Sequence, residues 1–363
     1  MNTIEEELRK AGISNICPIN DKARNAIATY VASSLCNRFP ELRLNFNTIG
    51  TSITKLTMYV ADMEQNGVGA SYFYKNSSIY FKRGLSFDKV KKLAVHECIH
   101  HFQEIKDAKG ELHRLGLCSY VGNKAYGNAL NEAAVQLMSS YANNDTPEIV
   151  TYYGITMPAD SSNYYPLLCN LIKQLGYLTG FQTLFESTFF SNDAFFEKFK
   201  AAVGENNAFT IQKNFEKILQ TENRINMINV KIQTEDLPYK KFKRATNATE
   251  KGKQEIQKLF LNTQNLIITS YFDAKINKLK TITDIEEYRK HLYSFINLIG
   301  STESYTFFND YYIQKMSELD VKYEKIVKNV SLTVVKKNKI VMFFDAIKKL
   351  LGIKQKEKEE QKF

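Results

Sequence analysis

The sequence contains few of the residues that interrupt or cross-link a chain. Its 363 residues include 16 glycines, 6 prolines and 5 cysteines, and tryptophan is absent. Because glycine and proline are scarce and 44% of the residues are apolar, a disordered or low-complexity chain is excluded and a packed core is expected. The cysteines are odd in number, widely spaced and free of any C-x-x-C pair, which argues against a disulfide framework and favours reduced thiols.

We expect neither a targeting segment nor a membrane-spanning segment. The first seven residues, Met1 to Glu7, are acidic and contain no apolar run, so we expect no secretory signal. No uninterrupted apolar run is long enough to span a bilayer. Together with reduced thiols, these absences predict a cytoplasmic protein.

Positive charge is in excess but is unevenly distributed. The net charge is +10, and much of the excess lies in the run Lys240 to Arg244 and between Lys336 and Lys362. We expect the run at Lys240 to Arg244 to be a solvated loop. No module combines clustered basic residues with stacking aromatics, so no nucleic-acid partner is expected.

Hydrophobic periodicity predicts an α+β fold that is mainly helical. In chain order the patterns predict a helical segment over 4–38, a strand over 56–61, an antiparallel pair over 70–74 and 78–81, helices over 87–106 and 124–141, a loop around Gly154 and Pro158, and further helix to about 203. Beyond Glu205 the composition shifts to Lys, Asn, Ile and Gln with long helical periodicity. We therefore expect one domain over 1–205, with a small antiparallel sheet next to the 87–106 helix, and a helical C-terminal region over 206–363.

One motif within the predicted helix over 87–106 contains candidate metal-binding and catalytic residues. The residues from His96 to His100 match H-E-x-x-H, and this composition gives a chance match in roughly one sequence in a few hundred. Residues four apart share a helix face, so His96 and His100 can both bind one Zn²⁺. Glu97 lies beside that face, where it can act on a water molecule without being a ligand.

A catalytic zinc site needs a third protein ligand. Glu104 lies another turn beyond His100 and is too far along the helix axis to share the ion. The best candidate is Glu132 on the next predicted helix, although an isolated carboxylate there would be read as an ordinary solvated side chain. His113 and Glu111, in the intervening segment, are the alternatives.

The H-E-x-x-H motif followed by Asn131-Glu132 resembles the gluzincin group of zincin metallopeptidases, with the similarity covering about Ala70 to Tyr141. The resemblance implies that His96, His100 and Glu132 bind zinc and that Glu97 is the general base and acid. It also implies that 1–205 is a zincin-like peptidase domain. Gluzincins often place an Asp four residues after the ligand Glu. Here Gln136 stands there, able to accept a hydrogen bond from a ligand histidine but adding no charge.

The expected function is therefore hydrolysis of peptide bonds by a metal-activated water, with a peptide or protein as substrate. An oxyanion donor is also needed, and the sequence does not choose among five candidates: Tyr120, Tyr126, Tyr152, Tyr153 and His113. His101 should point away from the metal by about 100° of helix rotation and serve in packing. Cys98 lies on the buried side of the helix, where we expect an inert thiol.

The segment 340–351 has an amphipathic pattern flanked by lysines. We favour a terminal helix docked on the protein, and a contact with a membrane surface or a partner protein is the alternative. Two other functions stay open. One is a catalytically silent zincin-fold regulatory or partner-binding protein, and the other is a helical interaction protein with a fortuitous motif.

Overall fold

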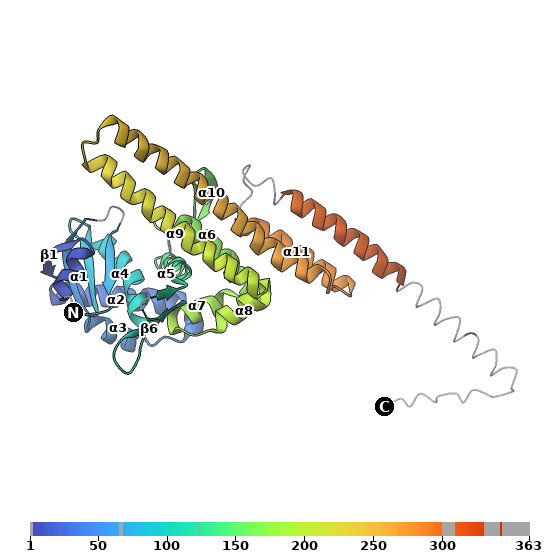
Figure 1. Ribbon diagram of the computed structural model, residues 1–363. Helices are drawn as coiled ribbons and strands as arrows, with labels where there is room; N and C mark the ends of the chain where they lie inside the picture. The colour runs from blue at the N-terminus through green and yellow to red at the C-terminus, as the bar shows by residue number, and fades with distance from the viewer. Residues whose placement is uncertain (1–2, 65–67, 123, 300–308, 330–341, 343–363) are drawn as a thin grey trace, which may run out of the picture. The chain divides into compact units, whose positions relative to one another are not determined.

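The computed structural model describes residues 3–64, 68–122, 124–299, 309–329 and 342 (Figure 1). These residues form two compact units, the first within 1–274 and 295–305 and the second within 275–294 and 306–363. The boundary predicted near residue 205 falls at Gly204, inside the first unit. The division into a peptidase domain and a C-terminal region stays a prediction. All residues of the predicted site lie in the first unit.

The first unit begins with helices around a four-stranded sheet. In chain order the elements are α1 (Ile4–Lys10), β1 (Ile13–Pro18), α2 (Asp21–Arg38), η1 (Pro40–Leu42), α3 (Phe46–Thr54), β2 (Thr57–Met63), β3 (Ala70–Phe73) and β4 (Ser78–Lys82). The segment over 4–38 is not continuously helical as predicted, because Gly12 ends α1 at φ +72° and β1 follows it. Strand β1 pairs with β2.

The strand order is β1-β2-β4-β3, which leaves β3 at one edge of the sheet. The predicted antiparallel pair is confirmed as β3 and β4. The sheet as a whole is mixed, whereas an antiparallel sheet was predicted, because β2 and β4 are parallel. The chain reverses from β2 into the edge strand β3 and reverses again into β4, which inserts between them and so runs in the direction of β2.

The helix carrying the H-E-x-x-H motif is α4 (Phe87–Phe102), which packs against β3. It begins at Phe87, as predicted, after the N-cap Ser86, whose hydroxyl accepts a hydrogen bond from the Lys89 N–H at 3.3 Å. It ends four residues earlier than predicted, because the chain turns into a four-stranded antiparallel sheet. The strands of this sheet are β5 (Glu104–Lys106), β6 (Leu112–Leu115), β7 (Cys118–Val121) and β8 (Lys124–Tyr126).

The next helix, α5 (Asn128–Ala142), is capped by a distant residue. Its N-cap is Gly127 at φ +86°, which offers no side-chain acceptor. Glu216, on α9 (Glu205–Thr234), supplies one instead: its Oε1 accepts a hydrogen bond from the Ala129 N–H at 2.9 Å. Because the first amides of a helix have no partner within it, this bond fixes α9 against the start of α5.

The remaining elements are helical except for one hairpin. They are β9 (Glu148–Tyr152), β10 (Ile155–Ala159), α6 (Pro166–Thr179), α7 (Phe181–Phe190), α8 (Ala194–Val203), α10 (Tyr239–Ile276) and α11 (Ile282–Ile299). The β9–β10 hairpin replaces the predicted loop. The run Lys240 to Arg244 is solvated as predicted but lies in the first turns of α10, not in a loop.

The mainly helical α+β fold is confirmed. Within the part of the chain that the structure describes, no helix combines the length and the apolar character needed to cross a bilayer. The predicted helix over 340–351 lies outside the described residues, apart from Met342.

A buried pair of amides joins the end of α4 to α5. The Gln103 Nε2 atom donates to Asn131 Oδ1 at 3.1 Å, and the Asn131 Nδ2 atom donates back to Gln103 Oε1 at 3.2 Å. Both side chains are fully buried. Gly116, at φ +58° in the β6–β7 turn, approaches them so closely that a Cβ atom there would lie 2.2 Å from Asn131 Oδ1. The pair therefore depends on a glycine at this turn.

Replacing Gly116 with Ala should destabilise the protein far more than replacing Gly122, which has the same φ of +58° and open space around its Cβ position. Gly122→Ala should lower the free energy of unfolding by about 1 kcal/mol through backbone strain alone. Gly116→Ala should cost about 2 kcal/mol more, because the methyl group displaces the amide pair. Denaturant unfolding of both variants measures the difference, and equal losses would contradict this account.

Candidate metal centre

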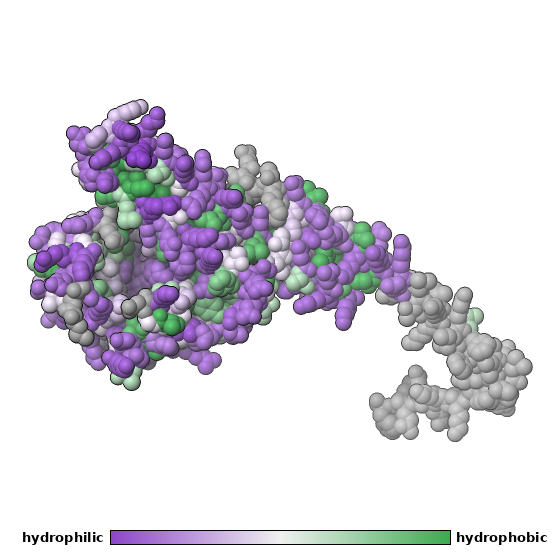
Figure 2. All heavy atoms as spheres, in the orientation of Figure 1, coloured by the Kyte–Doolittle hydropathy of each residue, from purple (hydrophilic) through white to green (hydrophobic). Residues whose placement is uncertain are grey.

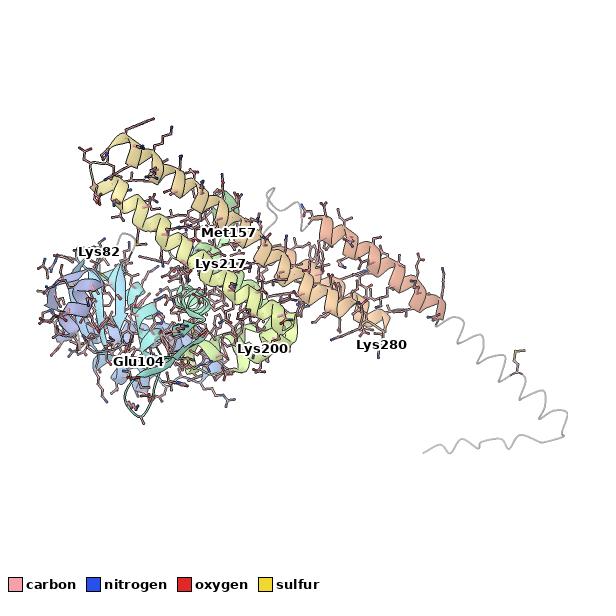
Figure 3. All side chains as sticks on the ribbon, viewed as in Figure 1. Lys82, Glu104, Met157, Lys200, Lys217 and Lys280 are labelled. Carbon is pink, nitrogen blue, oxygen red and sulfur yellow. The ribbon has the colours of Figure 1, made fainter. Side chains whose placement is uncertain are left out.

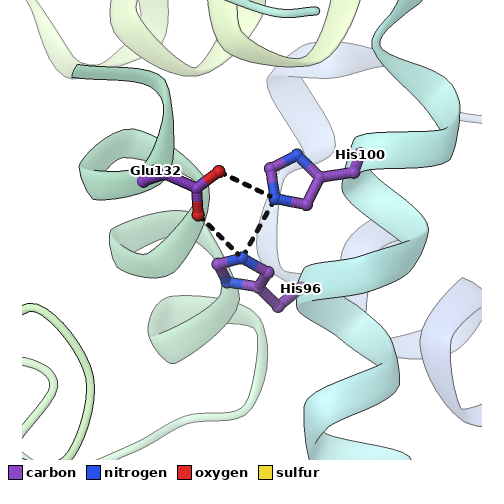
Figure 4. Close-up of side chains that lie close together, drawn as sticks. All are labelled: His96, His100 and Glu132. Carbon is purple, nitrogen blue, oxygen red and sulfur yellow. Dashed lines mark hydrogen bonds and ion pairs between the residues drawn. The ribbon is translucent and has the colours of Figure 1, made fainter. Parts of the chain in front are cut away.

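Three side chains from α4 and α5 converge inside the first unit, as Figure 4 shows. The Nε2 atoms of His96 and His100 lie 3.1 Å apart. The Glu132 carboxylate places one oxygen 3.6 Å from His96 Nε2 and the other 3.6 Å from His100 Nε2. The structure thus brings together the three residues that the sequence predicted as metal ligands.

These separations fit a tetrahedral zinc ion. Ligand bonds of roughly 2.0–2.1 Å at tetrahedral angles place neighbouring ligand atoms about 3.3 Å apart. The three observed separations differ from that value by a few tenths of an ångström. Two imidazoles and one carboxylate also leave a fourth position open, which is the donor set of catalytic zinc sites. His96, His100 and Glu132 could therefore hold a zinc ion with little movement.

Each imidazole is oriented by a glutamine through its other nitrogen. The Nδ1 atom of His96 lies 2.9 Å from Gln136 Oε1, and the Nδ1 atom of His100 lies 3.1 Å from Gln103 Oε1. An amide oxygen only accepts, so Nδ1 carries the proton and Nε2 is directed at the centre. The contact with Gln136 matches the role predicted for that position. Gln103 was not predicted, because it stands at the end of α4 with no motif around it.

The centre is held together by charge. Burial alone would raise the pKa of Glu132, but the two imidazoles outweigh burial and hold it well below its usual value. Burial likewise disfavours a charged His100, yet Glu132 raises the pKa of that imidazole to about 9. The pocket thus stabilises positive charge between the imidazoles, and a divalent cation would supply that charge in place of protons.

Glu97 lies beside the centre and is tied to the edge strand. Its Oε2 atom accepts a hydrogen bond from the Tyr72 N–H of β3 at 2.7 Å, and 7% of the residue is exposed. The Tyr72 hydroxyl donates to Glu104 Oε1 at 2.7 Å and lies 3.3 Å from His101 Nδ1. Glu104 (Figure 3) lies outside the metal group, as predicted, although it stands on strand β5 and not on the helix as expected. His101 serves in packing, as predicted.

The other sequence candidates lie elsewhere. His113 and Glu111 are exposed and do not belong to the cluster of His96, His100 and Glu132. Cys98 is fully buried, and burial followed by the nearby Glu97 raises the pKa of its thiol, so it packs as an inert side chain.

A cavity of about 1070 Å³ opens beside the centre, lined on one side by His96 and Glu97. The β9–β10 hairpin, the segment 160–165 and α9 supply other walls, and Figure 2 shows the hydrophilic surface hollowed on this unit. Of the five proposed oxyanion donors, only Tyr152 lines the cavity. Tyr165 and Glu222 line it too, and sequence reasoning missed both because neither stands in a recognisable motif.

Comparison with protein-family models, with curated proteins and with solved structures finds no match for this chain. The interpretation of the site therefore depends on its own geometry and donor set.

Elemental analysis of the purified protein should find about one zinc per chain. His96→Ala and Glu132→Ala should each lose most of it, because two remaining ligands hold the ion too weakly. The matched controls are His113→Ala and Glu111→Ala, which replace the same residue types outside the cluster and should keep full zinc content. Zinc retained by Glu132→Ala but lost from either control would place the third ligand in the segment before α5.

Proposed function

We propose that this protein is a zinc-dependent peptidase of the gluzincin type. The observation that carries the proposal is the convergence of His96, His100 and Glu132 at zinc-binding separations, with Glu97 directly beside them and facing the same cavity. A protein that only bound metal would have no use for this second carboxylate. The resemblance of the two sequence motifs to gluzincins supports the same class.

His96, His100 and Glu132 would hold the ion. A zinc ion in such a site lowers the pKa of a water molecule and polarises the carbonyl of the substrate. Glu97 accepts the proton of the attacking water and then delivers it to the leaving amine. The bond from the Tyr72 N–H fixes one oxygen of the Glu97 carboxylate and leaves the other free for this proton transfer.

A peptide is the substrate class that the surroundings favour. Strand β3 is an edge strand, and Ala70 at its start lines the cavity together with Gly69. An extended peptide can add to such an edge through main-chain hydrogen bonds. The cavity is also large enough for several side chains of a bound peptide.

Tyr165 is the best placed oxyanion donor. It lines the cavity with Glu97, and burial, together with the charges of Glu132 and Glu97, raises the pKa of its hydroxyl well above the usual value. The hydroxyl therefore keeps its proton and can donate it. The backbone of Tyr165 is left-handed at φ 51° just before Pro166, so the side chain is set at a constrained turn.

The state of the cysteines bears on where in the cell the protein acts. The five cysteines are all free thiols, which supports the cytoplasmic location expected from the sequence.

The competing function is that of a catalytically silent regulatory protein of the same fold. The presence of Glu97 argues against this alternative, because such a protein would not need a general base.

Glu97→Gln should keep about one zinc per chain and lose peptide hydrolysis by about 10²–10⁴-fold, because the amide cannot accept the proton of water. A mixed peptide library incubated with the wild-type protein and this variant, and read by mass spectrometry, measures cleavage. Equal activity of the two proteins, or no cleavage by zinc-loaded wild type, would refute the proposed function.

Tyr165→Phe should lower kcat by about 10²–10³-fold with little change in KM, because the lost hydroxyl acts mainly in the transition state. Tyr120→Phe is the control, since Tyr120 is a partly buried tyrosine that does not line the cavity. Steady-state kinetics on one cleaved peptide distinguishes the two. A larger loss in Tyr120→Phe would assign the oxyanion to that residue.

A further inference from the structure

Glu222 on α9 is a buried carboxyl with an unpartnered oxygen. The residue is 4% exposed, and its Oε1 atom has no hydrogen-bond partner. Burial raises the pKa of this carboxyl to about 8. A buried acid without a partner costs the fold free energy, so its presence in a cavity wall calls for an explanation.

Among the residues that the structure describes, no cation compensates Glu222: burial alone shifts its pKa. Lys173 forms an ion pair with Asp160 instead of with Glu222, with a nitrogen–oxygen distance of 2.7 Å. The neighbours that sense the charge of Glu222 include the hydroxyls of Tyr152 and Tyr165, which are neutral. No ion pair involves Glu222 within the described residues. The oxygen is therefore left for a group from outside the chain.

The cavity wall has a charge opposite to that of the chain. The chain carries a net charge of +10, yet six carboxylic acids and three lysines line the cavity. The pairs Lys92–Asp145, at 2.9 Å, and Lys173–Asp160 neutralise two of the acids, which leaves four acids, Glu64, Glu97, Glu148 and Glu222, against two lysines, Lys10 and Lys89. A ligand in this cavity thus meets an acidic lining, which favours positive charge.

Glu222 also has a fixed place relative to the candidate metal centre. It lies six residues after Glu216 on α9, about 9 Å along the helix axis, and Glu216 is bonded to α5 only three residues before Glu132. Tyr165 senses the charges of both Glu132 and Glu222, so the same tyrosine lies near each carboxylate. A single bound peptide could therefore reach both Glu222 and the candidate metal centre.

We propose that Glu222 binds a positively charged group of the peptide substrate and thereby sets the specificity of the site. The group is an ammonium or guanidinium, which comes either from a Lys or Arg side chain or from the free N-terminus of the peptide. Its arrival pairs the free oxygen of Glu222 and removes the cost of the buried lone carboxyl. This inference rests on the proposed peptidase function.

Binding of three synthetic peptides to zinc-loaded full-length protein tests the proposal. The protein used for every measurement carries the Glu97→Gln change, which stops turnover. Calorimetry gives the Kd of each peptide. One peptide is acetylated and amidated with a central Lys, the second replaces that Lys with norleucine, and the third is the norleucine peptide with a free N-terminus. At least one of the two charged peptides should bind on the order of tenfold more tightly than the neutral one.

Adding Glu222→Gln should abolish that advantage, while Glu222→Asp, which keeps the charge, should retain part of it. The matched control is Glu148→Gln, the same change at an exposed position lining the same cavity, which should keep the advantage within about twofold because solvent screens its charge. If the Lys peptide loses its tighter binding in Glu222→Gln, the group that Glu222 binds is a side chain. If the peptide with the free N-terminus loses it, the group is the N-terminal amine.

Equal binding of all three peptides, or an advantage that survives Glu222→Gln, would overturn the proposal. Cleavage of peptides by the wild-type protein without any preference for charge contradicts this inference alone. A charge preference that depends on Glu222, in a protein that cleaves nothing, contradicts the proposed hydrolysis and leaves a cation-binding cavity.

Discussion

The contact between α4 and α5 is the constraint on which the site depends. Two of the three candidate ligands, His96 and His100, come from α4 and the third, Glu132, comes from α5, so a shift of either helix separates them. The reciprocal amide bonds of Gln103 and Asn131 lock the helices next to His100 and Glu132. Gln103 also donates to the Thr188 carbonyl of α7 at 2.7 Å, which extends the lock to a third helix. Because all these groups are buried, slipping either helix would leave polar atoms without partners.

Local sequence patterns predicted that His96 and His100 lie side by side, because helix geometry determines their spacing. The four-residue spacing of His96 and His100 places both imidazoles on one face of any regular helix, and Glu132 stands on the next long helix. The acceptor role of Gln136 follows from the same geometry, one turn after Glu132. The antiparallel pair of β3 and β4 was also predictable, since alternating side chains flank a short turn.

Long-range contacts could not be predicted from the sequence. Gln103 acquires its partners only when α5 and α7 pack against the end of α4, and Tyr165 and Glu222 reach the cavity only when α6 and α9 pack against α5. No local pattern encodes that packing. Strand β1 was missed because a short strand between two helices carries little periodicity, and its partners on β2 lie 41 to 50 residues further on. The parallel pairing of β2 and β4 likewise depends on where β3 settles, which is a tertiary property.

The cap that Glu216 provides has a consequence for how the chain can be divided. A protein cut after Gly204 would retain His96, His100 and Glu132, yet the first turn of α5 would lose the acceptor for its Ala129 amide. The same cut would remove the wall of the cavity that α9 forms. The segment with the H-E-x-x-H motif is therefore not a self-sufficient module, and recombination that separated it from α9 would transfer His96, His100 and Glu132 without one wall of the cavity beside them.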